Sequence, residues 1–499
     1  DTLKMAKEIM QRGMGLLLDF HYSDWWADPG HQELPHAWKE LSEDELQDAV
    51  YSYTKAVMMA LDENGTYPDM VQIGNEIRCG MMWPIGAISN WKGLAKLLNA
   101  GIRAVRDTQG NRDTKIVIHL DQGGRYYYYE EWFDAALEHG VTDFDIIGLS
   151  YYPFWHGTFH DLKNTMEKLV ARYDKPLILA EMAHAYRRSQ GNLFGEAQEK
   201  IAGFPANPDA QKTVLELIMS IAAHVSKDMG LGAFYWEPFW QTKEDDDSWA
   251  SCMVLVDHTG MPTEGCKAFG VNPKETDINR IAKIYEPKAI TIPSINEWKN
   301  YLPKQVRVLM WDGRIENRDV CWEMDAVLNQ QEQHIQGALS TGERVSVSVR
   351  IDTNARNLIH NGDFEEELSF WEIDASGDVR QEIRQEIAEE FPFETKNYFY
   401  FTCKENLTLV MKQKLAHVEK GSYLLSLEYL GDNTTGVKVW MYAKCGDREY
   451  KVDIFPTDSE WVRHEIIFEV ENTGDIEVGL EVDSPAMYGK VRDVRVVKR

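Results

Sequence analysis

Val71-Gln72-Ile73-Gly74-Asn75-Glu76-Ile77 is a short apolar run that becomes polar at Asn75 and Glu76. The run predicts a buried strand, and the polar pair stands where that strand should end. Because an ionised carboxylate is costly to bury without a partner, Glu76 is expected at a solvated edge of the molecule. In a barrel of parallel strands that edge is the C-terminal face, where catalytic groups collect.

A second predicted strand ends in a carboxylate in the same way. Leu177-Ile178-Leu179-Ala180 is apolar and ends in Glu181, after a segment that predicts a helix and a turn. Two strand-end glutamates on one face are the minimum for glycoside hydrolysis, one as acid and base and the other as nucleophile. Glu237, at the end of a later predicted strand, stays open as an alternative to Glu181.

Six strands that alternate with helices are predicted in the first half of the chain. They are expected at residues 15–20, 71–74, 115–121, 145–150, 177–181 and 231–236. Strict alternation predicts parallel βαβ units and an α/β fold. Residues able to carry chemistry follow the strand ends but not the strand starts, and this asymmetry is typical of a (β/α)8 TIM barrel.

The sequence changes in character after residue 276. Residues 287–351 lose helical periodicity and show short alternating runs, which predict an immunoglobulin-like β-sandwich over residues 277–354. Residues 355–499 are a second all-β stretch. A chain of 499 residues has room for two or three domains, so we expect a barrel over residues 1–276 followed by two all-β sandwich domains.

The composition favours a neutral ligand. The formal net charge is −28, and nucleic acids and anionic membranes both need clustered Lys and Arg, so neither is expected as a partner. The 16 tryptophans suit stacking on sugars, although large protein cores use tryptophan as well. The sequence contains no run of about 18 apolar residues that would predict a membrane span.

No metal or other cofactor is expected, with one site considered for calcium. His156 and His160 are four residues apart but lack the intervening glutamate of metalloprotease helices. The loop Glu244-Asp245-Asp246-Asp247 could bind calcium, although a solvated acidic loop is the simpler prediction. The six cysteines are predicted to be ordinary thiols, and a Cys403–Cys445 disulfide is left open.

Several longer motifs resemble glycoside hydrolase family 53. They are Leu18-Asp19-Phe20-His21-Tyr22-Ser23-Asp24, Trp26-Ala27-Asp28-Pro29, the stretch 71–77 with Trp83-Pro84, and the stretches 148–157 and 234–238. Enzymes of this family are retaining endo-β-1,4-galactanases that act on the galactan of type I arabinogalactan side chains in pectin. The resemblance implies this activity here, with Glu76 as acid and base and Glu181 as nucleophile.

Substrate is expected to contact residues at the strand ends and in the loops that follow them. Asn75 would hydrogen-bond the sugar 2-hydroxyl group. Either Tyr151 or Tyr152 would donate to the nucleophile, and Trp236 would form the floor under the cleaved sugar. The full expected set is Asp19, His21, Trp26, Asn75, Trp83, His119, Tyr151, Tyr152, Trp155 and Trp236.

The resemblance begins at the helix before the third strand of the family barrel. We therefore expect the first two of the eight strands, and an arginine that they would bring near the nucleophile, to be missing from an N-terminally truncated sequence. The strands at 15–20 and 231–236 would then be open edges. The sequence contains no signal peptide, but the resemblance implies a secreted or cell-surface protein that acts on plant cell walls.

The C-terminal half also carries two resemblances. Residues 302–351 resemble a bacterial immunoglobulin-like domain. Asn361-Gly362-Asp363-Phe364-Glu365, with Trp371, resembles the opening of carbohydrate-binding jelly rolls. The last domain is thus similar to a galactan-binding module, such as carbohydrate-binding module family 61.

Two other interpretations stay open from the sequence. The chain would be a non-catalytic galactan-binding or scaffold protein if its incomplete barrel no longer catalysed. It would be another retaining barrel hydrolase, such as a mannanase or a cellulase, if the two glutamates were combined with different aromatic platforms. Release of reducing sugar from linear β-1,4-galactan separates both from a galactanase. The oligomeric state is left open.

Overall fold

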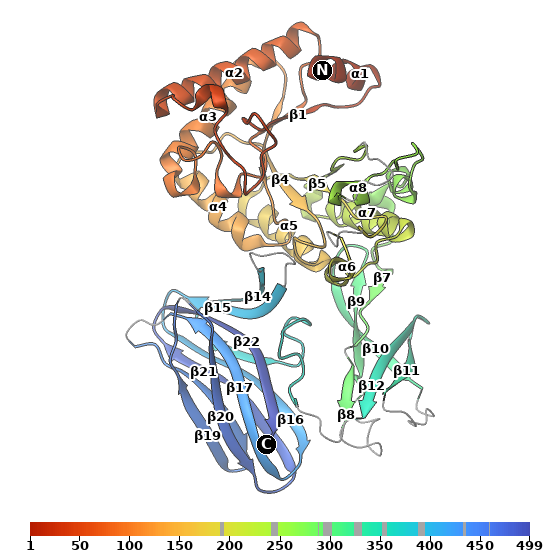
Figure 1. The fold of residues 1–499 in the computed structure, drawn as a ribbon, viewed down its shortest axis with the longest axis vertical. Coiled ribbons are helices and arrows are strands. Elements are labelled where there is room, and N and C mark those ends of the chain that lie inside the picture. Colours follow the sequence, from red (N-terminus) through yellow and green to blue (C-terminus); the bar gives the residue numbers. More distant parts are fainter. Residues whose placement is uncertain are drawn as a thin grey trace. The chain divides into compact units, whose positions relative to one another are not determined.

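The computed structural model describes residues 1–189, 194–240, 248–287, 289–292, 302–323, 332–351, 357–387, 395–432, 436–458 and 460–499 (Figure 1). The chain divides into two compact units, Asp1–Glu286 with Lys304–Val320, and Pro287–Pro303 with Cys321–Arg499. The acidic loop Glu244–Asp247, the calcium candidate, lies outside the described residues. The division into domains after residues 276 and 354 stays a prediction.

One parallel sheet of six strands forms the centre of the first unit. Across the sheet they follow the order β1 (Leu17–Phe20), β2 (Met70–Ile73), β3 (Lys115–Leu120), β4 (Ile146–Tyr151), β5 (Leu177–Met182) and β6 (Gly230–Tyr235). Each strand pairs in parallel with the next. The predicted α/β fold of the TIM-barrel type is confirmed, with β1 and β6 at the two ends of this sheet.

Helices connect successive strands, as the alternation predicts. They are α1 (Thr2–Gln11), α2 (Glu43–Glu63), α3 (Trp91–Thr108), α4 (Tyr126–Glu138), α5 (Phe159–Tyr173), α6 (Glu196–Ala202), α7 (Pro208–Ala223) and α8 (Trp249–Met253). Short 3₁₀ helices lie at His36–Trp38, Ile77–Cys79, Ile88–Asn90, Ser226–Asp228, Glu264–Gly270 and Pro273–Glu275. A capping box starts α2, because the Ser42 hydroxyl accepts from the Glu45 backbone and the Glu45 carboxylate accepts from the Ser42 backbone.

The apolar strand residues form a buried core with the helices. Its strand members are fully buried and include Val71, Ile73, Ile116, Ile118, Ile147, Leu149, Leu177 and Leu179. Burying an aliphatic side chain of this size contributes about 1.5–3 kcal/mol, so the apolar residues hold the strands in register. The polar residues at the C-terminal ends of the strands are thereby brought to one edge of the sheet.

A β-hairpin from later in the sequence packs on the first unit. β9 (Gln305–Met310) pairs antiparallel with β7 (Ile281–Ile284) and with β10 (Ile315–Trp322). Trp311, in the turn between β9 and β10, is buried in the apolar core of the α/β sheet. His160 Nδ1 on α5 lies 3.0 Å from the Gly313 carbonyl oxygen in the same turn.

The second unit contains β11 (Glu332–Leu339), which pairs antiparallel with β12 (Arg344–Ile351), and β8 (Ile290–Ile292), which pairs in parallel with β12. Two five-stranded sheets follow. One has the order β13 (Glu372–Ser376), β16 (Leu407–Val418), β21 (Gly474–Ser484), β18 (Val439–Cys445) and β19 (Arg448–Ile454). The other has the order β14 (Val379–Ile387), β15 (Thr395–Cys403), β22 (Met487–Lys498), β17 (Gly421–Gly431) and β20 (Val462–Val470). Together the two sheets enclose one apolar core, so the predicted all-β sandwich is confirmed.

The motif that opens this sandwich has a structural task. Asn361 is buried, and its side-chain amide donates to the carbonyl oxygens of Glu367 and Ser369. The Trp371 indole donates to the Asn361 carbonyl oxygen at 3.1 Å, and Phe364 is fully buried. These residues fix the entry loop of the sandwich and do not form an exposed sugar platform.

Two smaller predictions concern cysteines and membrane spans. All six cysteines are free thiols, so Cys403 and Cys445 do not form the disulfide that the sequence left open. In the part of the chain that the structure describes, no helix is both long and apolar enough to cross a bilayer.

Candidate active site

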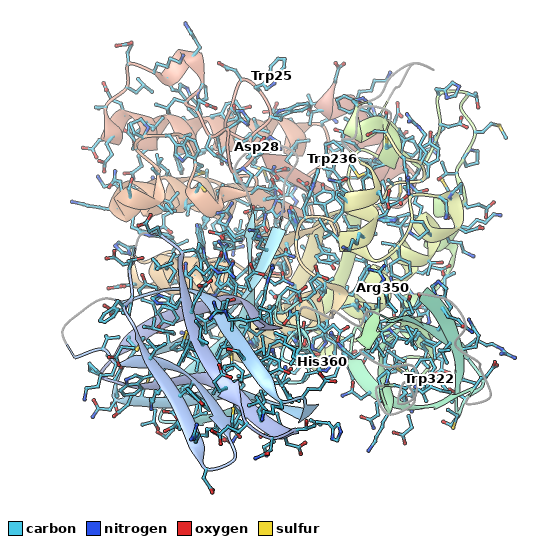
Figure 2. All side chains as sticks on the ribbon, turned by 60° about the horizontal axis from the view of Figure 1, so that its bottom comes forward. Trp25, Asp28, Trp236, Trp322, Arg350 and His360 are labelled. Atoms are coloured by element: carbon cyan, nitrogen blue, oxygen red, sulfur yellow. The ribbon has the colours of Figure 1, made fainter. Side chains whose placement is uncertain are left out.

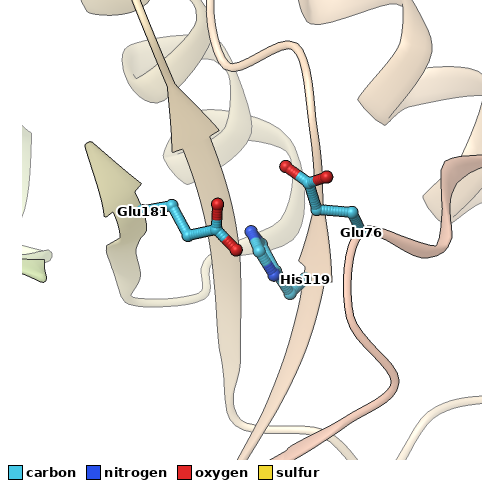
Figure 3. A group of neighbouring side chains, drawn as sticks. All are labelled: Glu76, His119 and Glu181. Carbon is cyan, nitrogen blue, oxygen red and sulfur yellow. The ribbon is translucent and has the colours of Figure 1, made fainter. Parts of the chain in front are cut away.

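Glu76 and Glu181 face each other across the C-terminal ends of the strands (Figure 3). A carboxylate oxygen of each lies within 4.8 Å of a carboxylate oxygen of the other. Glu76 follows β2 in the left-handed backbone conformation, with φ 47° and ψ 48°. That conformation is uncommon for a residue other than glycine and concentrates at functional sites. The backbone turn after β2 therefore brings the Glu76 carboxyl group toward β5.

The surroundings of Glu76 favour its neutral form. The Ser150 hydroxyl on β4 lies 2.5 Å from Glu76 Oε1. Burial raises the pKa of Glu76 well above that of an ordinary glutamate, and the negative charges of Glu181 and Asp121 raise it further. The neutral, protonated form of Glu76 is therefore favoured, and this is the form that can give up a proton as an acid.

Glu181 has a hydrogen-bond donor that favours its ionised form. Burial raises the pKa of Glu181 to about 7, and the negative charge of Asp19 contributes to the rise. The Tyr152 hydroxyl donates to Glu181 Oε2 at 2.7 Å, which stabilises the ionised form and lowers this pKa. Two neighbouring carboxyl groups with separated pKa values divide into an acid and a nucleophile. The predicted alternative, Glu237, is exposed after β6.

The two neighbouring tyrosines have different positions. Tyr152 follows β4 and is the donor to Glu181, which answers the question that the sequence left open. Tyr151 is fully buried, and its hydroxyl donates to the Gly157 carbonyl oxygen at 3.0 Å. The predicted substrate contact of Tyr151 is therefore wrong, because successive strand residues alternate between the two faces of a sheet.

Asn75 and His119 are held by protein partners. Asn75 Nδ2 donates to the Ala27 carbonyl oxygen at 2.8 Å, and Gln72 Nε2 donates to Asn75 Oδ1 at 3.0 Å. His119 is fully buried on β3. Its Nδ1 lies 2.9 Å from Asn75 Oδ1 and its Nε2 lies 2.8 Å from Ser150 Oγ. His119 therefore supports neighbouring side chains and has no ring nitrogen left for a sugar hydroxyl group.

Glu76, His119 and Glu181 are the cluster among the described residues whose ligand atoms are close enough to hold a metal ion. A metal-binding histidine needs one ring nitrogen with a free lone pair. Both nitrogens of His119 already have hydrogen-bond partners, so this cluster does not fit a metal. The arrangement fits proton transfer and attack by a carboxylate instead.

Asp19 and His21 lie beside Glu181. His21 Nε2 lies 3.0 Å from Asp19 Oδ2, and the Ala27 backbone N–H donates to His21 Nδ1 at 2.9 Å. Both side chains are partly exposed, with 33% of the His21 side chain and 29% of the Asp19 side chain accessible to solvent. They are placed where a bound sugar could reach them.

Tryptophan rings form a row that joins the loop after β1 to the segment after β6. Trp26, from the loop after β1, is 52% exposed, and its ring centre lies 6.2 Å from that of Trp240. Trp240 stacks on Trp236 at 6.3 Å with an angle of 18° between the rings. Trp25, which is labelled in Figure 2, has its ring centre 6.3 Å from that of Trp26 and is 75% exposed. Exposed indole rings in a row are suited to an extended sugar chain.

The other two predicted tryptophans are less exposed. The Trp83 indole donates to the Cys79 carbonyl oxygen at 2.9 Å, which holds the ring against the short helix that follows Glu76. Trp155 is half-buried, with its ring centre 5.6 Å from that of Tyr152. Trp155 thus packs against the tyrosine that donates to Glu181.

Ser150 and the ion pair of Arg78 with Asp121 were not predicted from the sequence. Ser150 is fully buried, and the signal for it was a polar residue near the end of an apolar strand, as at Asn75. Arg78 Nε lies 2.7 Å from Asp121 Oδ1. No spacing rule pairs these two residues in the sequence. Trp240 was also missed, because exposure of a tryptophan is not visible in a sequence.

Comparison with known proteins gives one consistent answer for the first half of the chain. Residues 1–269 match the model of glycosyl hydrolase family 53. An uncharacterised protein in the bgaB 5′ region of Niallia circulans is 39% identical over 286 residues, which are 54% of this chain and 77% of that protein. An arabinogalactan endo-beta-1,4-galactanase of Thermothelomyces thermophilus is 34% identical over 244 residues, 48% of this chain and 72% of that enzyme. Among solved structures, the Ignisphaera aggregans GH53 catalytic domain is 38% identical with a TM-score of 0.51, over 54% of this chain and 76% of that domain.

Proposed function

The chain belongs to glycosyl hydrolase family 53, and on this basis we propose that it hydrolyses β-1,4-galactosidic bonds within galactan chains with retention of configuration. The observation that carries the proposal is the facing pair Glu76 and Glu181, with oxygens within 4.8 Å. Retaining enzymes place the two carboxyl groups about 5–5.5 Å apart, whereas inverting enzymes leave about 6.5–9.5 Å for a water. The name of the Thermothelomyces thermophilus relative supports galactan as the substrate.

The reaction proceeds in two displacements. In the first, Glu181 forms an ester with the anomeric carbon while the bond from that carbon to the departing O4 breaks and Glu76 gives O4 its proton. In the second, ionised Glu76 takes a proton from water, the water oxygen bonds to the anomeric carbon, and the ester bond to Glu181 breaks. The raised pKa of Glu76 suits the first step, and the hydrogen bond from Tyr152 suits Glu181 as the nucleophile.

Other residues of the site would bind the sugar chain. Trp26, Trp236 and Trp240 offer ring faces that follow one another in a row. Asp19 and His21 offer polar atoms next to Glu181, and His21 lies close enough to influence the charge of Glu181. These residues would set the position of the galactosyl unit that is cleaved.

The terminal sandwich would keep the enzyme on its substrate. Its two antiparallel sheets around one core fit a carbohydrate-binding jelly roll, and its opening motif resembles such modules. Binding to cell-wall galactan would place the protein outside the cell. The full chain should therefore be retained by insoluble galactan even when Glu76→Gln abolishes cleavage, and loss of retention would count against the binding role.

Chemical rescue tests the two glutamates separately. Glu181→Gln with azide should yield an α-galactosyl azide, because azide then attacks in place of the nucleophile. Glu76→Gln with an activated substrate and azide should yield the β-galactosyl azide, because the ester still forms on Glu181. The unchanged protein should release reducing sugar from linear β-1,4-galactan with the β-anomer first. If the unchanged protein and the variants bind galactan but release no reducing sugar, a non-catalytic scaffold protein is favoured. An α-anomer formed first would contradict retention of configuration.

A further inference from the structure

Four side chains, beginning with the proposed acid Glu76, form a buried chain of hydrogen bonds. Glu76 Oε1 lies 2.5 Å from Ser150 Oγ, Ser150 Oγ lies 2.8 Å from His119 Nε2, and His119 Nδ1 lies 2.9 Å from Asn75 Oδ1. The residues come from the ends of β2, β3 and β4. Each contact involves a group that either donates or accepts, so the positions of the hydrogens along the chain depend on one another.

The Asn75 end fixes the first hydrogen. A backbone carbonyl oxygen only accepts, so the Asn75 atom 2.8 Å from the Ala27 carbonyl oxygen is the amide nitrogen. Asn75 Oδ1 is then the atom that faces His119, and it also accepts from Gln72. Since Oδ1 has no hydrogen, His119 Nδ1 must carry the hydrogen of that contact.

The middle of the chain fixes the second hydrogen. His119 is fully buried, and its two nitrogens face the uncharged groups of Asn75 and Ser150. Burial, together with the smaller effects of the nearby His21 and His156, lowers the pKa of His119 to about 3. The ring is therefore neutral with its hydrogen on Nδ1, and Nε2 accepts from the Ser150 hydroxyl.

The Glu76 end follows from the count of hydrogens. Ser150 has one hydroxyl hydrogen, and His119 takes it. Ser150 Oγ can then only accept from Glu76 Oε1, and a carboxyl group donates only when it is protonated. We propose that Ser150 and His119 hold Glu76 in its protonated form, with hydrogens directed from Glu76 to Ser150, from Ser150 to His119 and from His119 to Asn75.

The consequence is that ionised Glu76 loses a buried hydrogen bond. If Ser150 turned to donate to the Glu76 carboxylate, His119 Nε2 would be left buried without a donor. If Ser150 kept its bond to His119, the carboxylate would lack that donor. The neutral acid satisfies all of these groups, and leaving a buried polar group unpaired is unfavourable. His119 is thus a positioning residue that acts on Glu76 through Ser150.

Charged and titratable groups on other elements also face Glu76. They are Glu181 on β5, Asp121 after β3 with its partner Arg78, Asp28 in the loop after β1, Tyr129 on α4 and Tyr152 after β4. None of these residues is substituted when His119 is changed, so they are common to the compared proteins.

The test changes His119 and measures Glu76 directly. Asn at position 119 keeps an N–H group that can reach Asn75 Oδ1 but offers nothing to Ser150, which is then free to donate to Glu76. The Glu76 carboxyl band in infrared difference spectra, assigned by its loss in Glu76→Gln, should therefore titrate about one pH unit lower in His119→Asn. If Ser150 already donates to Glu76 in the unchanged protein, the midpoint stays the same, and that result would overturn the proposal.

A second measurement needs no variant that might unfold the protein. Nitrogen NMR of the unchanged chain should show His119 as a neutral ring with hydrogen on Nδ1 at every pH between about 5 and 8, where an unperturbed histidine would titrate. A ring with hydrogen on Nε2, or a charged ring, would contradict the proposed direction. The proposal rests on the proposed role of Glu76 as acid, but both measurements are made without galactan. A protein that failed to cleave galactan would therefore still give a clear result here.

Discussion

The Tyr152 hydroxyl lies 2.7 Å from Glu181 Oε2, whereas the hydroxyl of the preceding residue, Tyr151, donates to the backbone of Gly157. Two adjacent tyrosines thus have opposite tasks, one at the proposed nucleophile and one in the core.

Removing the Tyr152 hydroxyl should shift the acid limb of the pH profile. The hydrogen bond favours ionised Glu181, so Tyr152→Phe should raise the pKa of Glu181 above its value of about 7. Because the nucleophile must be ionised, the acid limb of kcat/KM on galactan should move to higher pH. Tyr151→Phe is the matched control and should leave that limb unchanged. An equal shift in both variants would show that Tyr152 does not act through Glu181.

Glu76→Gln should lower kcat on galactan by about 10²–10⁴-fold, which is the usual contribution of a general acid. The same change should affect an aryl galactoside with a good leaving group much less in the first displacement, since that group departs without a proton. Pre-steady-state release of the aryl group measures this step. Similar losses on both substrates would argue that Glu76 is not the acid.

The contribution of Glu181 to the stability of the fold should fall as the pH rises between about 4.5 and about 7. Burial raises the pKa of Glu181 from 4.5 to about 7. In that window the unfolded chain releases the proton while the folded chain still holds it, so a rise in pH favours unfolding. Glu181→Gln removes this group, and its melting temperature should exceed that of the unchanged protein more at pH 8 than at pH 5. A constant difference would mean that Glu181 titrates normally in the folded state.

Packing between α3 and the strands should make Gly101 intolerant of a side chain. A Cβ at Gly101 would lie 2.8 Å from the Tyr22 hydroxyl and 2.9 Å from Ile73 Cγ2. Overpacking of this kind usually costs about 1–3 kcal/mol, more than alanine gains by helix propensity. Gly270→Ala is the control, because no atom within 4 Å would meet its Cβ. Urea denaturation should separate the two variants, and equal midpoints would show that α3 adjusts freely.

The tryptophan row should bind sugars away from the cleaved bond. Trp26 is 52% exposed and is next to Trp240. Trp26→Ala should therefore raise KM for long galacto-oligosaccharides and leave KM for the shortest cleavable chain nearly unchanged. Equal effects on both lengths would place Trp26 at the cleaved sugar instead.

The position of the two glutamates was predictable because two signals coincide in the sequence. Apolar runs such as Val71–Ile73 predict buried strands, and a carboxylate directly after such a run predicts the open edge of a sheet. The structure places Glu76 and Glu181 at that edge and within 4.8 Å of each other. The position of each glutamate at a strand end is therefore encoded locally.

The partners of the glutamates were not predictable in the same way. Whether Tyr151 or Tyr152 turns toward Glu181 depends on where β4 ends, and a shift of one residue reverses the answer. His119 and Ser150 come from different strands, and their contact exists only after the strands pair. Direction along a hydrogen-bond chain is a property of the assembled site, so no single segment contains it.

The turn between β9 and β10 has a practical consequence for anyone who shortens this protein. Trp311 is buried in the core of the first unit, and Gly313 is so close to Lys163 and Ile221 that a Cβ would lie about 3 Å from both. A protein truncated at residue 276 would lack Trp311 and would expose the apolar surface that Trp311 covers to water. This truncated protein should aggregate during purification, whereas a protein that extends to residue 323 should not.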